Sequence, residues 1–196
     1  MSVTRVVPSL VFAAAVFVAA APALAQEAPR AIDHRVLATS RTSTMEREMN
    51  EAAEAGFRYS AVMGGETAVG GNEVVTVMSR PAGGQSDRYE YRLLATSRTS
   101  TMQRELREAA ERGFEYRGQT VFQSAFGGRE VVCILERAVD RPAAANASYR
   151  LLATTRTSTL ERELKEAGLD GYQVVGMTVG ETAMGGRELV AILRAR

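Results

Sequence analysis

The sequence predicts an α+β fold of three tandem β-α-β-β repeats, each a three-stranded sheet with one helix on one face. Three near-identical segments begin at His34, Tyr91 and Tyr149, at offsets of 57 and 58 residues. Strings repeated at a fixed spacing of this size indicate repeated structural units. In each copy, a short aliphatic segment precedes a stretch of helical periodicity that ends at a glycine. Two further strand-like stretches complete the copy.

The chain divides into a leader and three repeats. We expect residues 1–25 to be a signal peptide and the repeats to occupy residues 31–80, 88–138 and 148–196. The stretches between the repeats are rich in Pro, Ala and polar residues and have no apolar periodicity, so we interpret them as linkers.

The leader has the features of a secretory signal peptide. Arg5 precedes an apolar run over residues 6–20, and Ala23 and Ala25 form the small-x-small cleavage signature before Gln26. The run is too short to span a bilayer comfortably, and no second apolar run follows. The alternative is a retained N-terminal anchor. We therefore expect export to the periplasm or secretion, with no membrane span after cleavage.

The second copy illustrates the elements. Residues 91–96 are short, aromatic and aliphatic, which predicts a strand. Ser100 and Gln103 have the spacing of a capping box, with Ser as the N-cap of a helix. The helix has an apolar stripe and ends before Gly113, a residue suited to a C-terminal cap. The stripe consists of Met102, Leu106, Ala109 and Ala110.

Two strands follow the helix. Residues 114–122 alternate between apolar and polar, which predicts a half-exposed strand, and residues 130–135 are almost continuously apolar, which predicts a central one. A right-handed crossover then gives the strand order 1-3-2. The sheet face without the helix still needs cover, and its candidate residues are Leu94, Val132 and Ile134.

A repeat of roughly 50 residues is marginally stable alone, so the second faces must be buried. They could pack on each other or on another chain. Two copies could form a ferredoxin-like pair, or all three could surround a pseudo-threefold axis. The sequence leaves these arrangements open. The odd number of copies makes a homo-oligomer a reasonable expectation.

The composition excludes several kinds of chemistry. Without Arg5 the mature chain has 23 basic and 23 acidic residues, which argues against nucleic-acid binding. His34 is the only His and Cys133 the only Cys, so no internal disulfide and no zinc site of His and Cys ligands can form. We expect His34 on an edge strand and Cys133 in the core. The chain has no known nucleotide-binding or hydrolase motif, and we predict no catalytic residue, metal or cofactor.

One recurring segment, Arg-Thr-Ser-Thr, is not fully explained by the fold. Helix capping accounts for the Ser, but a positive charge is mildly unfavourable at a helix start. Arg, hydroxyl groups and free N–H groups are the components of an anion site. The candidate ligand-binding residues are Arg41, Ser43, Thr44, Arg98, Ser100, Thr101, Arg156, Ser158 and Thr159.

The third copy contains YRLL, then LERELKEAGLDGYQVV, then GGRELVAILR. This pattern resembles a small uncharacterised bacterial β-α-β-β family, a domain of unknown function. The resemblance covers each repeat almost end to end and implies the fold. It implies no activity. The triple copy and the Arg-Thr-Ser-Thr segment depart from the family's usual single copy.

We therefore expect an exported, non-catalytic binding or scaffolding protein built from repeated modules. Its partner would be an unknown protein or a small anionic ligand. The alternative is an envelope enzyme that acts on a small anionic or glycan substrate with Glu, Arg and Ser chemistry. A deep pocket containing a Glu with a raised pKa would favour the enzyme.

Overall fold

The computed structural model describes residues 31–68, 71–83, 87–96, 98–123, 129–140, 147–181 and 186–195. The predicted signal peptide lies outside them. The first module has strands β1 (Ile32–Thr39), β2 (Arg58–Thr67) and β3 (Gly71–Pro81) and helix α1 (Thr42–Glu54). The second has β4 (Tyr89–Thr96), α2 (Thr99–Glu111), β5 (Glu115–Gln123) and β6 (Arg129–Ala138). The third has β7 (Ser148–Thr154), α3 (Thr157–Leu169), β8 (Gln173–Glu181) and β9 (Arg187–Ala195).

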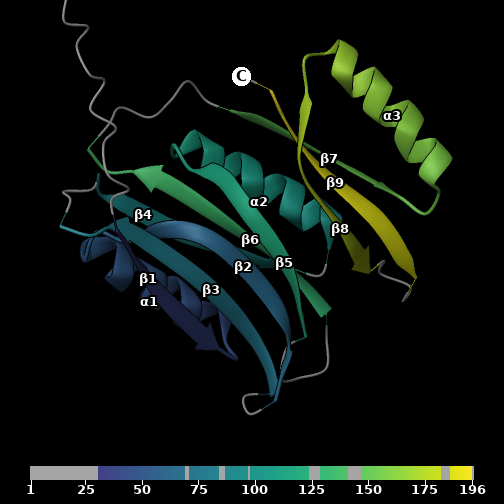
Figure 1. The fold of residues 1–196 in the computed structure, drawn as a ribbon. Coiled ribbons are helices and arrows are strands. Elements are labelled where there is room, and N and C mark those ends of the chain that lie inside the picture. Colours follow the sequence, from purple (N-terminus) through teal and green to yellow (C-terminus); the bar gives the residue numbers. More distant parts are fainter. Residues whose placement is uncertain are drawn as a thin grey trace, which may run out of the picture.

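Each module is the predicted three-stranded sheet with one helix (Figure 1). The strand orders are β1-β3-β2, β4-β6-β5 and β7-β9-β8, and every pairing is antiparallel. The third strand of each module is therefore central, as its continuous apolar sequence predicts.

The helices end as predicted, at a glycine. In α2, Gly113 has φ +83°, a conformation that favours glycine. The Gly113 N–H donates to the Ala110 carbonyl at 2.8 Å, and the Phe114 N–H donates to the Ala109 carbonyl at 3.0 Å. These two bonds form a Schellman motif, which turns the chain into the next strand. Phe114 is buried, so the same turn also contributes to the core.

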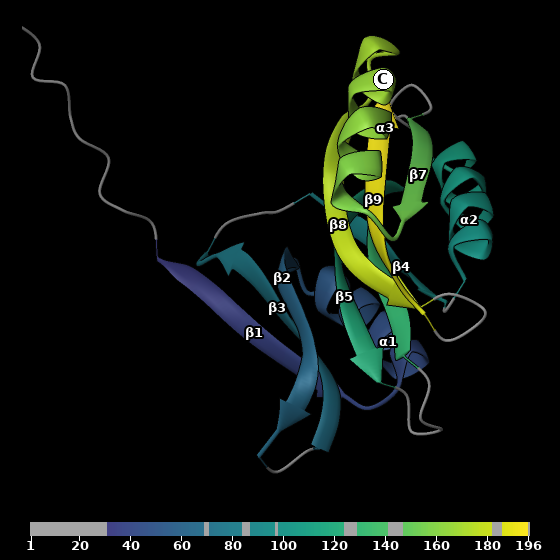
Figure 2. The same ribbon diagram turned by 90° about the vertical axis from the view of Figure 1, so that its right-hand side faces the viewer.

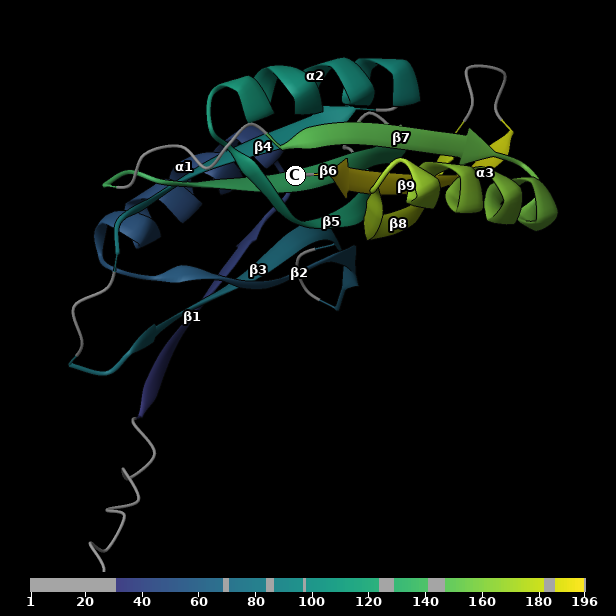
Figure 3. The same cartoon turned by 90° about the horizontal axis from the view of Figure 1, so that it is seen from above.

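The modules stack in a row (Figures 1 and 3). We call the sheet face that points away from a module's own helix its head face. The tail face of a module consists of its helix together with the side of the sheet that the helix covers. In the second module, Val132 and Ile134 on the head face pack with Met45 and Met49 of α1. The head face of the second module is therefore seated on the tail face of the first.

The second interface repeats this arrangement. Tyr149 and Ile192 of the third module's head face pack into the cluster around Met102 and Leu106 of α2. Helix α1 lies against β4 and α2 against β7, while β2 lies beside β5 and β5 beside β8. The open alternatives are thus resolved. The modules form a head-to-tail row of three separate sheets, without a ferredoxin-like pair or a pseudo-threefold axis.

One expected head-face residue was wrong. Leu94 lies opposite Cys133 in the register and belongs to the cluster beneath α2, on the tail face. Residues on successive strand positions point to opposite faces. Because β4 and β6 are apolar on both faces, the sequence alone did not distinguish the two sides.

Candidate binding surface

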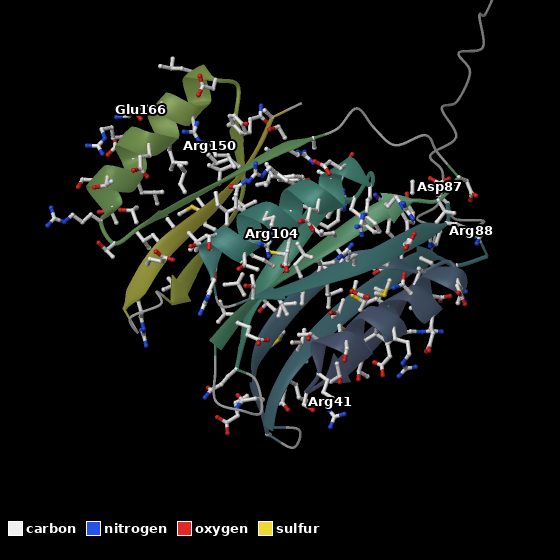
Figure 4. All side chains as sticks on the ribbon, turned by 180° about the vertical axis from the view of Figure 1, so that it is seen from behind. Arg41, Asp87, Arg88, Arg104, Arg150 and Glu166 are labelled. Carbon is white, nitrogen blue, oxygen red and sulfur yellow. The ribbon has the colours of Figure 1, made fainter. Side chains whose placement is uncertain are left out.

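The Arg-Thr-Ser-Thr segments lie at the starts of the three helices, one in each module. Arg41, Arg98 and Arg156 are the N-cap residues, with extended backbone (φ −134°, −120° and −123°). All three are exposed, and Arg41 extends from the start of α1 in Figure 4. The segments therefore belong to three separate helix starts and do not meet in one site.

The expected capping box was wrong. Ser43, Ser100 and Ser158 are the second residues of their helices, and none of the three helices has a side-chain cap. Instead, the N-cap Arg N–H groups donate to the hydroxyl of the Thr two residues earlier, for example Arg98 N to Thr96 Oγ1 at 3.1 Å. This local turn holds the Arg in the extended region, and each helix begins two residues earlier than a Ser N-cap would place it.

The Glu or Gln side chains of the expected capping boxes in α1 and α2 bond to the next module instead. Gln103 Oε1 accepts from Leu151 N at 2.5 Å, and Gln103 Nε2 donates to Tyr149 O at 2.7 Å. Glu46 Oε2 likewise accepts from Leu93 N at 2.7 Å. The partners are backbone groups of the edge strands β7 and β4, which would otherwise lack a neighbour. Helices α1 and α2 therefore each clamp the first strand of the following module.

Asn50 completes the clamp on β4. Its Oδ1 accepts from Tyr91 N at 2.9 Å, and its Nδ2 donates to Tyr91 O at 2.9 Å. The amide thus pairs with both backbone groups of one residue in the neighbouring module. Such an arrangement satisfies a part-buried strand edge without adding a strand.

A buried carboxylate joins the first two modules. Glu136 is 5% exposed, and its oxygens lie 2.7–3.1 Å from Arg58 nitrogens of the first module. Tyr91 Oη donates to Glu136 Oε2 at 2.8 Å, and Arg117 Nε lies 3.4 Å from Oε1. Two guanidinium groups and a hydroxyl group therefore surround the carboxylate. A buried charge needs partners of this kind.

The second interface has the same ion pair with the charges exchanged. Glu115 occupies the position of Arg58, and Arg194 occupies that of Glu136. Their side chains lie 3.4 Å apart. Both acidic residues therefore belong to the second module, one on the side of the first module and the other on the side of the third.

Tyrosines and glycines fit together at both interfaces. Tyr59 N donates to Tyr91 Oη at 2.8 Å, and Tyr116 N donates to Tyr149 Oη at 2.7 Å. A Cβ on Gly118 would lie 2.2 Å from the Tyr59 hydroxyl oxygen, and a Cβ on Gly176 would lie 2.3 Å from that of Tyr116. Only glycine leaves room for these side chains.

The other buried titratable groups are also structural. Cys133 is fully buried, as expected, and burial raises the pKa of its thiol to about 12. Burial likewise raises the pKa of the Tyr91 and Tyr149 hydroxyls. A thiol with so high a pKa is not nucleophilic near neutral pH. His34 lies on edge strand β1, as expected, with Nδ1 2.8 Å from Ser79 Oγ.

The head face of the first module stands apart from the other two because no described element covers it (Figure 2). Val36 is 64% exposed and Met63 55% exposed, and Ile32 is exposed on the same face. Val75 and Val77 lie between them in the register and are half-buried. These five residues form an apolar surface on the first head face. The equivalent head faces of the second and third modules are buried between modules.

The tail face of the third module is open as well. Val174, Met177 and Val179 lie opposite Leu193, Ala191 and Leu189, on the side of α3. All three are about half exposed. Six of the eight exposed large hydrophobic residues in the described part of the chain therefore lie on the two ends of the row. The other two are Val139 and Leu169.

Two shallow hollows lie beside the linker between the first and second modules. The larger, of about 430 Å³, is lined by residues that include Arg58, Tyr59, Ser79 and Tyr89. The smaller, of about 240 Å³, lies between α1 and β4. Among the described residues, no helix has the length and apolarity to cross a membrane, and no three His, Cys, Asp or Glu side chains gather as metal ligands.

Sequence reasoning missed the residues that join the modules, namely Asn50, Arg58, Tyr59, Tyr91, Glu115, Gly118, Glu136, Gly176 and Arg194. A signal was present in the aligned copies. Arg58 and Ser79 become Glu115 and Glu136 in the second copy, and Gln173 and Arg194 in the third. Charges that change together between otherwise similar copies indicate contacts between copies rather than within one.

No protein-family model matches the chain, and neither a curated protein nor a solved structure matches it. The resemblance to the β-α-β-β domain of unknown function therefore stays a prediction.

Proposed function

We propose that this chain is an exported, non-catalytic scaffolding protein that binds a partner protein through the head face of its first module. The observation that carries the proposal is the exposure of Val36 and Met63 on a face whose counterparts are buried. Exposed contiguous apolar surface on a folded protein marks a site of interaction.

The use of the titratable groups supports binding over catalysis. The carboxylate between modules, Glu136, is held by two Arg side chains and a Tyr hydroxyl. Both oxygens of this carboxylate are therefore occupied by contacts within the protein, which leaves neither of them directed at a substrate pocket. Cys133 is buried beneath α2. Glu136 therefore serves the packing between modules, and Cys133 serves the core beneath α2.

Anion or glycan binding at the Arg-Thr-Ser-Thr segments is the competing proposal, and an envelope enzyme on such a substrate is its catalytic form. The exposed Arg41, Arg98 and Arg156 at helix starts favour it. A small anion needs several convergent donors. Since the three segments belong to separate modules, each would have to bind alone.

The proposal is tested by affinity capture from the native envelope extract. The unsubstituted chain and the Met63→Glu and Val139→Glu variants serve as baits. Both residues are exposed and apolar, but only Met63 lies on the head face. We expect Met63→Glu to lose a protein that the other two baits retain. Equal capture by all three baits would contradict the proposal.

Export is tested separately. We expect the mature chain to begin at Gln26, after the Ala23-x-Ala25 signature. Intact-mass measurement of the protein in the envelope fraction checks this. A mass that still includes residues 1–25 would contradict cleavage.

A further inference from the structure

We propose that the head face of the first module binds the tail face of the third module in a second copy of this chain. The inference rests on the proposed function and names the partner of the same surface. The chain would then associate head to tail, by the contact that already joins its own modules.

Continuity with the two internal interfaces is the first argument. Each internal interface seats a head face on a tail face, and the row ends with one unused face of each kind. Ile32, Val36 and Met63 are exposed at one end, and Val174, Met177 and Val179 at the other. A surface that is complementary to another surface of the same molecule favours head-to-tail assembly.

Side-chain volumes at the two ends also match. Both internal interfaces place a Tyr of the tail face against a Gly of the head face. At the free ends, the corresponding residues are Val174 and Ala61. The smaller tail residue leaves space, and the larger head residue fills part of it. Two changes that compensate in this way are expected of faces that meet.

The polar positions agree as well. The internal ion pairs are Arg58 with Glu136 and Glu115 with Arg194. At the free ends, the corresponding residues are Gln173 and Ser79, both neutral and able to form a hydrogen bond. No like charges would therefore meet. By contrast, Glu115 of one copy would face Glu136 of another if second modules met in this way.

The clamp on the strand edge is retained. Glu161 of α3 corresponds to Glu46 and Gln103, which accept from Leu93 N and Leu151 N. The corresponding N–H on the edge strand β1 belongs to Val36. Glu161 is exposed, and its Oε1 accepts from Lys165 Nζ at 2.6 Å, so its carboxylate is open to an incoming strand.

A head-to-tail contact between identical chains is heterologous, so it builds a closed ring or an open filament. In a ring, and away from the ends of a filament, each chain has one occupied head face and one occupied tail face. A head-to-head dimer, in contrast, would use the same surface of both copies and leave both tail faces free.

Sedimentation velocity of the chain from Gln26 onward tests the inference over low micromolar to millimolar concentrations. We expect concentration-dependent association that Met63→Glu and Met177→Glu each weaken by about tenfold or more. An equimolar mixture of the two variants should form a one-to-one complex, because one retains its tail face and the other its head face. The chain that carries both substitutions has neither face intact, so it should stay monomeric when it is mixed with either single variant.

Charge variants provide an independent measurement. Ser79→Arg with Gln173→Glu copies the second internal ion pair and should strengthen association. Ser79→Glu with Gln173→Glu places like charges together and should weaken it by a similar factor. Both variants should retain the far-ultraviolet circular dichroism spectrum of the unsubstituted chain.

A chain that stays monomeric throughout would overturn the inference, as would association that Met177→Glu leaves unchanged. The proposed function fails in a different way. If the chain is monomeric but captures another protein through Met63, the proposed function stands and only the second copy is excluded. If Met63→Glu alters neither association nor capture, both fail.

Discussion

The guanidinium of Arg58 contacts both carboxylate oxygens of Glu136 across the boundary between the first two modules, with nitrogen–oxygen distances of 2.7–3.1 Å. Glu136 is buried, whereas the Arg58 side chain is 42% exposed. The exposed cation thus neutralises the buried anion. Removing the cation leaves an underpaired charge inside the protein, which is more harmful than losing a surface pair.

Arg58→Ala should therefore lower the free energy of unfolding by about 2 kcal/mol. Arg47→Ala is the matched control, because Arg47 pairs with Glu51 on the exposed face of α1. The control should change stability by about 0.3 kcal/mol. Urea denaturation of both variants measures the difference. Equal effects would show that the buried carboxylate does not depend on Arg58.

The helix clamp and the helix cap make opposite predictions for two residues of α2. Gln103→Ala removes two hydrogen bonds to β7 and should cost about 1–2 kcal/mol of stability. Ser100→Ala should be neutral or slightly stabilising, since Ser100 is exposed, caps nothing and has a lower helix propensity than Ala. Thermal and urea denaturation check both. A large loss of stability in Ser100→Ala, with none in Gln103→Ala, would show that Ser100 caps the helix after all.

The contact between Tyr59 and Gly118 predicts a rescue. Gly118→Ala places a methyl group 2.2 Å from the Tyr59 hydroxyl oxygen and should cost about 1–3 kcal/mol. Adding Tyr59→Val gives the same Val and Ala that stand at these positions on the two free ends, Val174 and Ala61, and should recover part of that loss. A double-mutant cycle by urea denaturation measures the coupling. Strictly additive effects would show that the two residues do not share the space.

Alkaline pH should destabilise the protein through Cys133. Its pKa rises from 9.0 in the unfolded chain to about 12 in the fold, because burial disfavours the thiolate. The stabilisation is therefore complete below pH 9.0 and is lost as pH rises toward about 12. Unfolding free energies across this range measure the slope. Cys133→Ala, the residue of the third copy, should flatten it, and an unchanged slope would exclude Cys133 as the cause.

The Arg-Thr-Ser-Thr segments predict a null result. Phosphate, sulfate or uronic acids should not raise the thermal midpoint, because each helix start offers one Arg rather than a converging set of donors. Calorimetric scans with and without each anion check this. A rise in the midpoint that Arg41→Ala, Arg98→Ala and Arg156→Ala together abolish would instead establish anion binding.

The architecture of a single module could be predicted because local signals determine it. The apolar periodicity places the helix, Gly113 ends it, and the continuous apolar run from Val131 to Leu135 predicts the central strand. The face of Leu94 could not be predicted, since a strand that is buried on both sides has no alternation.

The arrangement of the modules could not be predicted from the sequence. Gln103 stands at a capping-box position, yet its amide binds a strand that begins 45 residues later, at Ser148. A short-range pattern and a long-range contact compete for the same side chain, and spacing alone does not decide between them. The candidate surface was likewise hidden, because Val36 and Met63 have the sequence pattern of an ordinary strand. Only the position of their module at the end of the row exposes them.

The clamps of Glu46, Asn50 and Gln103 give the chain a direction of assembly. The chain emerges with its N-terminus first, so α1 is complete before β4 exists, and α2 is complete before β7. Each finished module is thus a template on which the next strand docks. Truncation should be unequal in its effects. Loss of the third module leaves the seat of the second intact, whereas loss of the first removes the surface on which the second module is seated.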